Sequence, residues 1–106
     1  MNDLVSQLNG VLQSINTLIM NNTDPDTNTK LWKMHNVYTA LRDTALGKDY
    51  DQTTADYTAA QAGLAAATKA ANAAIADINA IASAFQPLIT AAQTADKVVG
   101  LLKLAF

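Results

Sequence analysis

The sequence predicts an all-α protein, an antiparallel bundle of three to four helices in which residues 1–106 form one domain. Apolar residues recur at intervals of three and four, the spacing of one face of a helix. Clusters of Asn, Asp and Gly separate these periodic segments. Alanine, the best helix former, occurs fifteen times between Ala55 and Ala84. These three observations together predict an all-helical protein.

The first helix, expected over about residues 3–21, should be a core helix. Asn2 or Asp3 can cap its start, because short polar side chains accept hydrogen bonds from the first free backbone N–H groups. Its apolar face is wide, and the large aliphatic residues on it are Leu4, Leu8, Val11, Ile15 and Leu18. A face of this width is typical of a helix that is covered on more than one side.

The second helix is expected over about residues 29–46, after a loop at residues 21–28 that contains turn-forming residues and no large apolar side chain. Gly47 is placed to end it. Asp51 or Thr53 can cap the helix that follows. The apolar row of the second helix is Leu31, Met34, Tyr38, Leu41 and Ala45.

The third element is one long Ala-rich helix over about residues 52–86, kinked or broken at Pro87, with a further helical segment over about residues 88–105. A heptad pattern places an apolar residue at every a and d position of this half of the chain. Those positions are Tyr57, Ala60, Leu64, Ala67, Ala71, Ala74, Ile78, Ile81, Phe85, Leu88, Ala92, Ala95, Val99, Leu102 and Phe106.

The pattern keeps its phase across Pro87, which favours a kinked helix or two helices that meet end to end. A reversal at this point is the alternative, because proline is also favoured at the first position of a new helix. A straight helix over residues 52–105 would reach about 80 Å, far beyond the first two helices. Either the last segment folds back to complete a four-helix bundle, or part of it is covered by another chain.

The alanine face of the third helix needs large partners, because each alanine buries little more than a methyl group. The first helix supplies leucine and isoleucine on a broad face. We therefore predict that the first helix packs against residues 59–76, with large side chains entering the spaces between small ones.

Composition and motifs favour a non-enzymatic protein without metal or other cofactor. The net charge is −2, which argues against nucleic acid as a partner. There is no cysteine, no Gly-rich phosphate loop and no pair of carboxylates spaced for acid–base chemistry. Asp24, Asp26 and Asn28 have the spacing that opens a calcium loop, but the required glycine and glutamate positions are Thr29 and His35. We interpret this segment as a capped loop, and His35 as a packing residue beside the apolar row.

The expected function is assembly: self-association into a homo-oligomer, or binding of a helical protein partner. The segment from Val98 to Phe106 is apolar on most sides, and such a helix end is normally covered. Trp32 lies off the main apolar row and is either a core residue or an interface anchor. The predicted interaction residues are Trp32, Phe85, Leu88, Val99, Leu101, Leu102, Leu104 and Phe106.

The alternative is an exported or membrane-active protein whose Ala-rich hairpin and last helix insert into a membrane or lie on it. A low-charge surface rich in Ala, Thr, Asn and Gln is typical of exported bacterial or assembling proteins. The first residues lack a basic region followed by an apolar run, so no cleaved signal peptide is expected and any export would be non-classical. The resting protein should be soluble, and its location is unknown.

Overall fold

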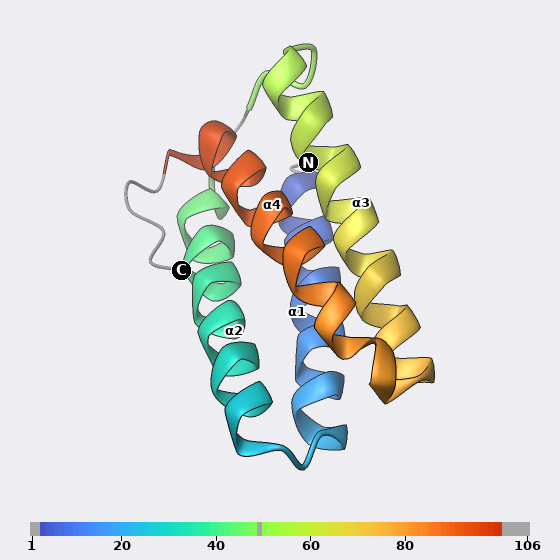
Figure 1. The fold of residues 1–106 in the computed structure, drawn as a ribbon. Helices are drawn as coiled ribbons and strands as arrows, with labels where there is room; N and C mark the ends of the chain where they lie inside the picture. The colour runs from blue at the N-terminus through green and yellow to red at the C-terminus, as the bar shows by residue number, and fades with distance from the viewer. Residues whose placement is uncertain (1–2, 49, 101–106) are drawn as a thin grey trace.

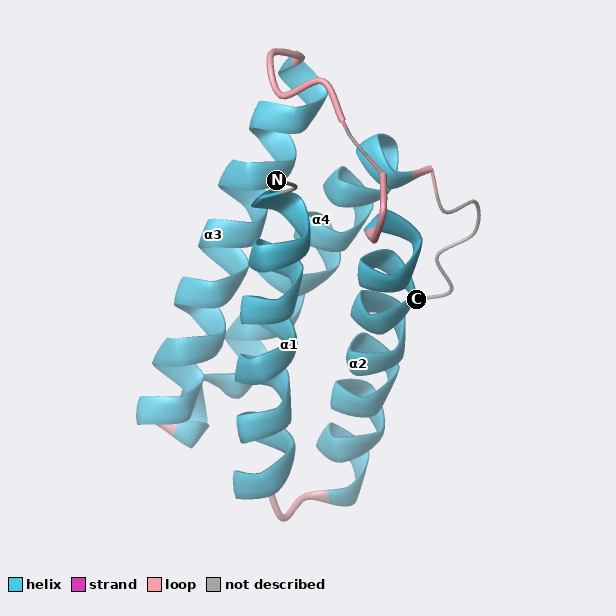
Figure 2. Cartoon of the chain, turned by 180° about the vertical axis from the view of Figure 1, so that it is seen from behind, coloured by secondary structure: helices cyan, strands magenta, loops and turns pink. Residues whose placement is uncertain are grey.

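The computed structural model describes residues 3–48 and 50–100 and contains four α-helices (Figure 1). They are α1 (Asp3–Asn21), α2 (Pro25–Ala45), α3 (Ala55–Ala76) and α4 (Ile81–Val99). A single 3₁₀ turn, η1 (Ile78–Ala80), precedes α4. The described residues form a helical bundle without strands, which confirms the predicted fold class (Figure 2).

The bundle consists of two antiparallel hairpins, α1–α2 and α3–α4, that lie side by side (Figures 1 and 2). The hairpins meet through two parallel pairs: α1 packs against α3, and α2 packs against α4. The contact between α3 and α4 is the most extensive, and the contact between α2 and α4 is the least extensive of the four helix pairs. One side of the bundle is therefore packed less closely than the others.

The start of α2 lies earlier in the sequence than predicted. The side chain of Asp24 accepts hydrogen bonds from the Thr27 backbone N–H (3.1 Å) and the Thr27 hydroxyl (2.6 Å). These bonds, from the Thr27 hydroxyl first, lower the pKa of the Asp24 carboxyl below its usual value. Pro25 occupies the first helical turn, where its missing N–H has no cost. The predicted loop at residues 21–28 was too long because its Asp-Pro pair starts the helix.

The long Ala-rich helix ends at Ala76, and the predicted break at Pro87 was wrong. Asp77 leaves the helix in an extended conformation, and its carboxylate accepts a hydrogen bond from the Asn79 N–H at 3.1 Å. Because Asp and Asn offer such local bonds, they reverse the chain here. Pro87 lies inside α4, where it removes only the backbone bond that its N–H would have made to Ser83.

The outer ends of the second hairpin are also shorter than predicted. The hydroxyl of Thr54 accepts the Tyr57 N–H at 3.1 Å, so α3 starts after Thr54 and not at residue 52. At the other end, Gly100 adopts the left-handed conformation (φ 77°) and its N–H donates to the Asp96 carbonyl at 2.8 Å. Glycine adopts this conformation at little cost and ends α4. The rest of the segment predicted at residues 88–105 lies outside the described residues.

The core combines large side chains from α1 with small ones from α3, and the predicted pairing of these two helices is confirmed. Leu8 and Ile15 are fully buried in the same cluster as Ala60 and Ala67. Between α3 and α4 the backbones approach closely: a Cβ atom on Gly63 would lie 3.5 Å from the Ala91 Cα. Small residues on both helices permit this distance.

The apolar row of α4 is covered by the chain itself, whereas one of the two alternatives left open by the sequence was that part of this segment is covered by another chain. Leu88 and Val99 belong to the main core cluster, together with Ala91, Ala92 and Ala95. The hairpin turn at Asp77 explains this burial, because it folds this row back onto α3. Burial of α4 up to Val99 is therefore a property of the single chain.

A buried hydrogen bond joins α2 to α4. The hydroxyl of Tyr38 donates to the backbone carbonyl of Leu88 at 2.6 Å, and the Tyr38 side chain is fully buried. Loss of hydration disfavours the phenolate and raises the pKa of Tyr38 well above its usual value of about 10. The phenol therefore stays neutral in the folded protein at pH values where it ionises in the unfolded chain.

Replacing Tyr38 by phenylalanine should lower the free energy of unfolding by about 1 kcal/mol at pH 7, the typical net contribution of one hydrogen bond. The wild type should then lose stability as the pH rises above about 10, by up to about 1.4 kcal/mol per pH unit, because only its unfolded state releases the proton. Tyr38→Phe has no phenol at this position and should not lose stability in this way. The free energies of unfolding of the two proteins should therefore converge as the pH rises above about 10. Urea denaturation at pH 7, 10 and 11 measures the difference in free energy of unfolding between the two proteins. A difference that stays constant with pH would contradict a buried, neutral Tyr38 phenol.

Candidate functional site

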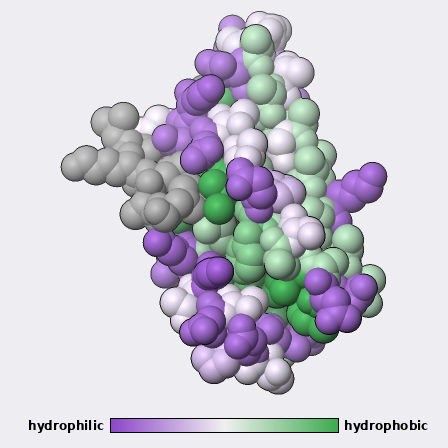
Figure 3. All heavy atoms as spheres, in the orientation of Figure 1, coloured by the Kyte–Doolittle hydropathy of each residue, from purple (hydrophilic) through white to green (hydrophobic). Residues whose placement is uncertain are grey.

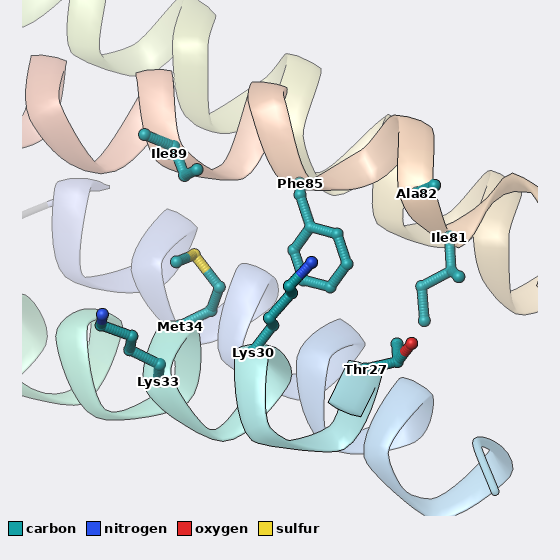
Figure 4. A pocket seen from close by; sticks show the side chains of 8 residues that line it. All are labelled: Thr27, Lys30, Lys33, Met34, Ile81, Ala82, Phe85 and Ile89. Carbon is teal, nitrogen blue, oxygen red and sulfur yellow. The ribbon is translucent and has the colours of Figure 1, made fainter. Parts of the chain in front are cut away.

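A groove of about 470 Å³ lies between α2 and α4, on the least closely packed side of the bundle (Figure 4). It follows about two turns of each helix. Its lining residues are Thr27, Lys30, Lys33 and Met34 from α2, and Ile81, Ala82, Phe85 and Ile89 from α4. Volumes of this size are common for binding sites in proteins.

The floor of the groove is apolar. Ile81, Phe85 and Ile89 recur at steps of four along α4 and are half-buried, while Met34 of α2 lies below them and is 4% exposed. Ala91 of α4 faces Gly63 of α3, where the two helices approach closely, so the bulky residues on the other flank of α4 lie opposite α2. The space-filling view shows apolar side chains over α4 beside hydrophilic ones over α2 (Figure 3).

The α2 edge of the groove carries two lysines. The Lys30 ammonium lies 5.7 Å from the centre of the Phe85 ring, which is within the range of a cation–π contact (Figure 4). Neither Lys30 nor Lys33 forms an ion pair with any described residue; Arg42 and Asp43 do, at 3.0 Å. The lining of the groove therefore combines an apolar floor with positive charge on one edge.

The predicted interaction residues have different places in the structure. Phe85 lines the groove, whereas Leu88 and Val99 are buried in the core. Trp32 is 49% exposed and its ring meets the edge of the His35 ring at a centroid distance of 5.2 Å, but it does not line the groove. The remaining predicted residues, Leu101, Leu102, Leu104 and Phe106, lie outside the described part of the chain.

The sequence analysis missed Lys30, Lys33 and Ile89 as groove residues. Lys30 and Lys33 are three positions apart, which places them on one flank of α2 beside Met34. Phe85 and Ile89 are the corresponding signal on α4, because they form a second row of large residues next to the alanine row. Only the pairing of α2 with α4 turns these two flanks into one groove.

Comparison of the chain with protein-family models, with curated proteins and with solved structures finds no match. Function is therefore inferred from the geometry of the chain.

Two further observations concern the described helices. None of them is both long and apolar enough to cross a membrane. Within the same residues, no group of three or more histidine or aspartate side chains is placed to hold a metal ion. At the calcium-like sequence, the Asp24 carboxylate is engaged by Thr27, and Asn28 exchanges hydrogen bonds with Asn22.

Proposed function

We propose that this protein is a non-enzymatic interaction module that binds a helical segment of a second protein molecule in the groove between α2 and α4. The observation that supports this most directly is the row of Ile81, Phe85 and Ile89, large apolar residues that are only partly buried although Leu88 and Val99 on the same helix are buried in the core. An accessible apolar row beside polar residues is typical of a protein-binding surface.

The shape of the groove suits a helix. A helix that docks in a groove contacts it through residues at positions i, i+3 or i+4, and i+7, which span about 10 Å. The row from Ile81 to Ile89 extends about 12 Å along α4. Two turns of a partner helix would therefore cover the floor, and the partner's apolar residues would replace water over Phe85.

A neutral synthetic helix tests this function. The probe is a fluorescently labelled peptide of about five turns, with leucines at i, i+3, i+4 and i+7 and glutamines elsewhere. We expect it to bind the wild-type protein and to bind Phe85→Ala at least about ten-fold more weakly, the size expected for loss of an aromatic anchor. Fluorescence anisotropy measures both affinities, and circular dichroism checks that the variant is folded.

Trp32→Ala is the matched control, since it removes an exposed aromatic residue of α2 that lies outside the groove. It should leave peptide affinity unchanged. Sedimentation velocity of the full chain without peptide reports whether a second copy of the chain can be the partner. The proposal is wrong if the wild type neither binds the peptide nor self-associates, or if Phe85→Ala and Trp32→Ala weaken binding equally.

A further inference from the structure

We infer that the groove selects a helix with acidic residues along one edge of its apolar face, supplied by a different protein. This inference rests on the proposed function and specifies the charge, the orientation and the origin of the partner. Two features carry it: the one-sided positive charge of the groove, and the location of the acidic residues of the described helices in their first or last turns.

The charge of the groove lies on one edge only. Lys30 and Lys33 line it from α2, whereas the residues that line it from α4 are uncharged. Asp24 and Asp26 both lie close to Lys30 in the sequence. Hydrogen bonds from Thr27 lower the pKa of Asp24 most, and the Lys30 charge is one of the smaller causes. Neither carboxylate lines the groove or forms an ion pair with the lysine. A bound helix would therefore meet positive charge along the side that faces α2, and a neutral surface along the side that faces α4.

The position of Lys30 links this charge to the apolar floor. Its ammonium lies over the Phe85 ring at 5.7 Å, so an apolar residue that docks on Phe85 must displace it (Figure 4). The displaced ammonium exchanges its contact with the ring for water, because Lys30 is an exposed residue. A carboxylate on the incoming helix, one turn away from its apolar anchor, would supply a charged partner instead.

The described helices of this chain do not offer such an acidic edge. Their acidic residues lie in first or last turns, where carboxylates favour helix starts or pair locally. These residues are Asp3 of α1, Asp26 and Asp43 of α2, Asp56 of α3 and Asp96 of α4. No described helix has a row of acids beside an exposed apolar row, so a different protein is the better complement to the groove.

Two charged probes test the inference. They keep the leucines of the neutral peptide and carry either glutamates or lysines along one edge of the apolar face. At low salt we expect the glutamate peptide to bind about five-fold more tightly than the neutral one, the size of two exposed ion pairs, and the lysine peptide more weakly. Added salt should reduce the difference, because it screens exposed charges.

Lys30→Gln combined with Lys33→Gln should abolish the preference for the glutamate peptide, so that this variant binds the glutamate and lysine peptides with affinities within about two-fold of each other. Lys69→Gln combined with Lys97→Gln is the matched control, since it removes the same charge from α3 and α4 outside the groove. This control should retain the preference. Equal loss in both double variants would show a general effect of net charge and would overturn the inference.

The outcomes separate the inference from the function on which it rests. Binding of the neutral peptide with no preference between glutamate and lysine overturns the inference and leaves the function intact. Absence of binding to all three peptides overturns both. The protein could also bind vesicles containing phosphatidylglycerol through Lys30 and Lys33 while it shows no preference between the peptides. This result would indicate an anionic membrane surface as the partner and would also overturn the inference.

Discussion

Replacing Leu8 with alanine should lower the free energy of unfolding by about 2–5 kcal/mol, the range for removing a buried leucine side chain. Leu8 of α1 is fully buried in the core cluster that also contains Ala60 and Ala67 of α3. Neighbours that are themselves alanines cannot reach into the space that the leucine leaves, so we expect a value in the upper part of this range. Urea denaturation followed by circular dichroism at neutral pH measures the change.

Met20→Ala is the control for this prediction. Met20 lies on the same helix but is 84% exposed, so its replacement should change stability by less than about 0.5 kcal/mol. A similar loss in both variants would mean that the packing of large residues on α3 does not determine the effect, and helix propensity could not explain it because alanine is the better helix former. A loss below about 1 kcal/mol for Leu8→Ala would contradict the described core.

The converse change, Ala67→Leu, should lower the free energy of unfolding by about 1–3 kcal/mol. Ala67 is fully buried on α3 and belongs to the cluster that contains Leu8 and Leu64. The added atoms would have to separate α3 from its neighbours, because a packed interior has few voids that could accept them. The same denaturation experiment measures the loss.

Ala66→Leu provides a control in the adjacent position, where the side chain is exposed. Leucine is nearly as good a helix former as alanine, so this variant should retain wild-type stability within about 0.5 kcal/mol. If Ala67→Leu is as stable as Ala66→Leu, the alanines of α3 do not set the distance between the helices, and the close packing described above is wrong.

The sequence predicted a contact correctly where two helices carry complementary apolar faces, one of large residues and one of small residues. The broad aliphatic face of α1 and the alanine row of α3 predicted both elements and their contact. The prediction failed at Asp77, because the heptad pattern continues in phase through residues that end the helix. The spacing of apolar residues indicates which face of a helix is buried. It does not indicate whether the helix continues or the chain reverses.

The candidate groove could be predicted only in part. Phe85 stood out because it is a large residue in an alanine-rich row. Lys30, Lys33 and Ile89 could not be assigned to the same site, because their proximity depends on the packing of α2 beside α4, two helices that are not consecutive in the sequence. The exposure of Trp32 likewise depends on which neighbours cover α2.

The pairing of the two hairpins also has a consequence for folding kinetics. The contacts that complete the core join α1 to α3 and α2 to α4, and the bond between Tyr38 and Leu88 closes a loop of fifty residues. Either hairpin alone would leave in water the apolar surface that the other hairpin covers, so neither is expected to persist as an independent folding unit. The chain should fold in one cooperative step, more slowly than bundles whose contacts are mostly local.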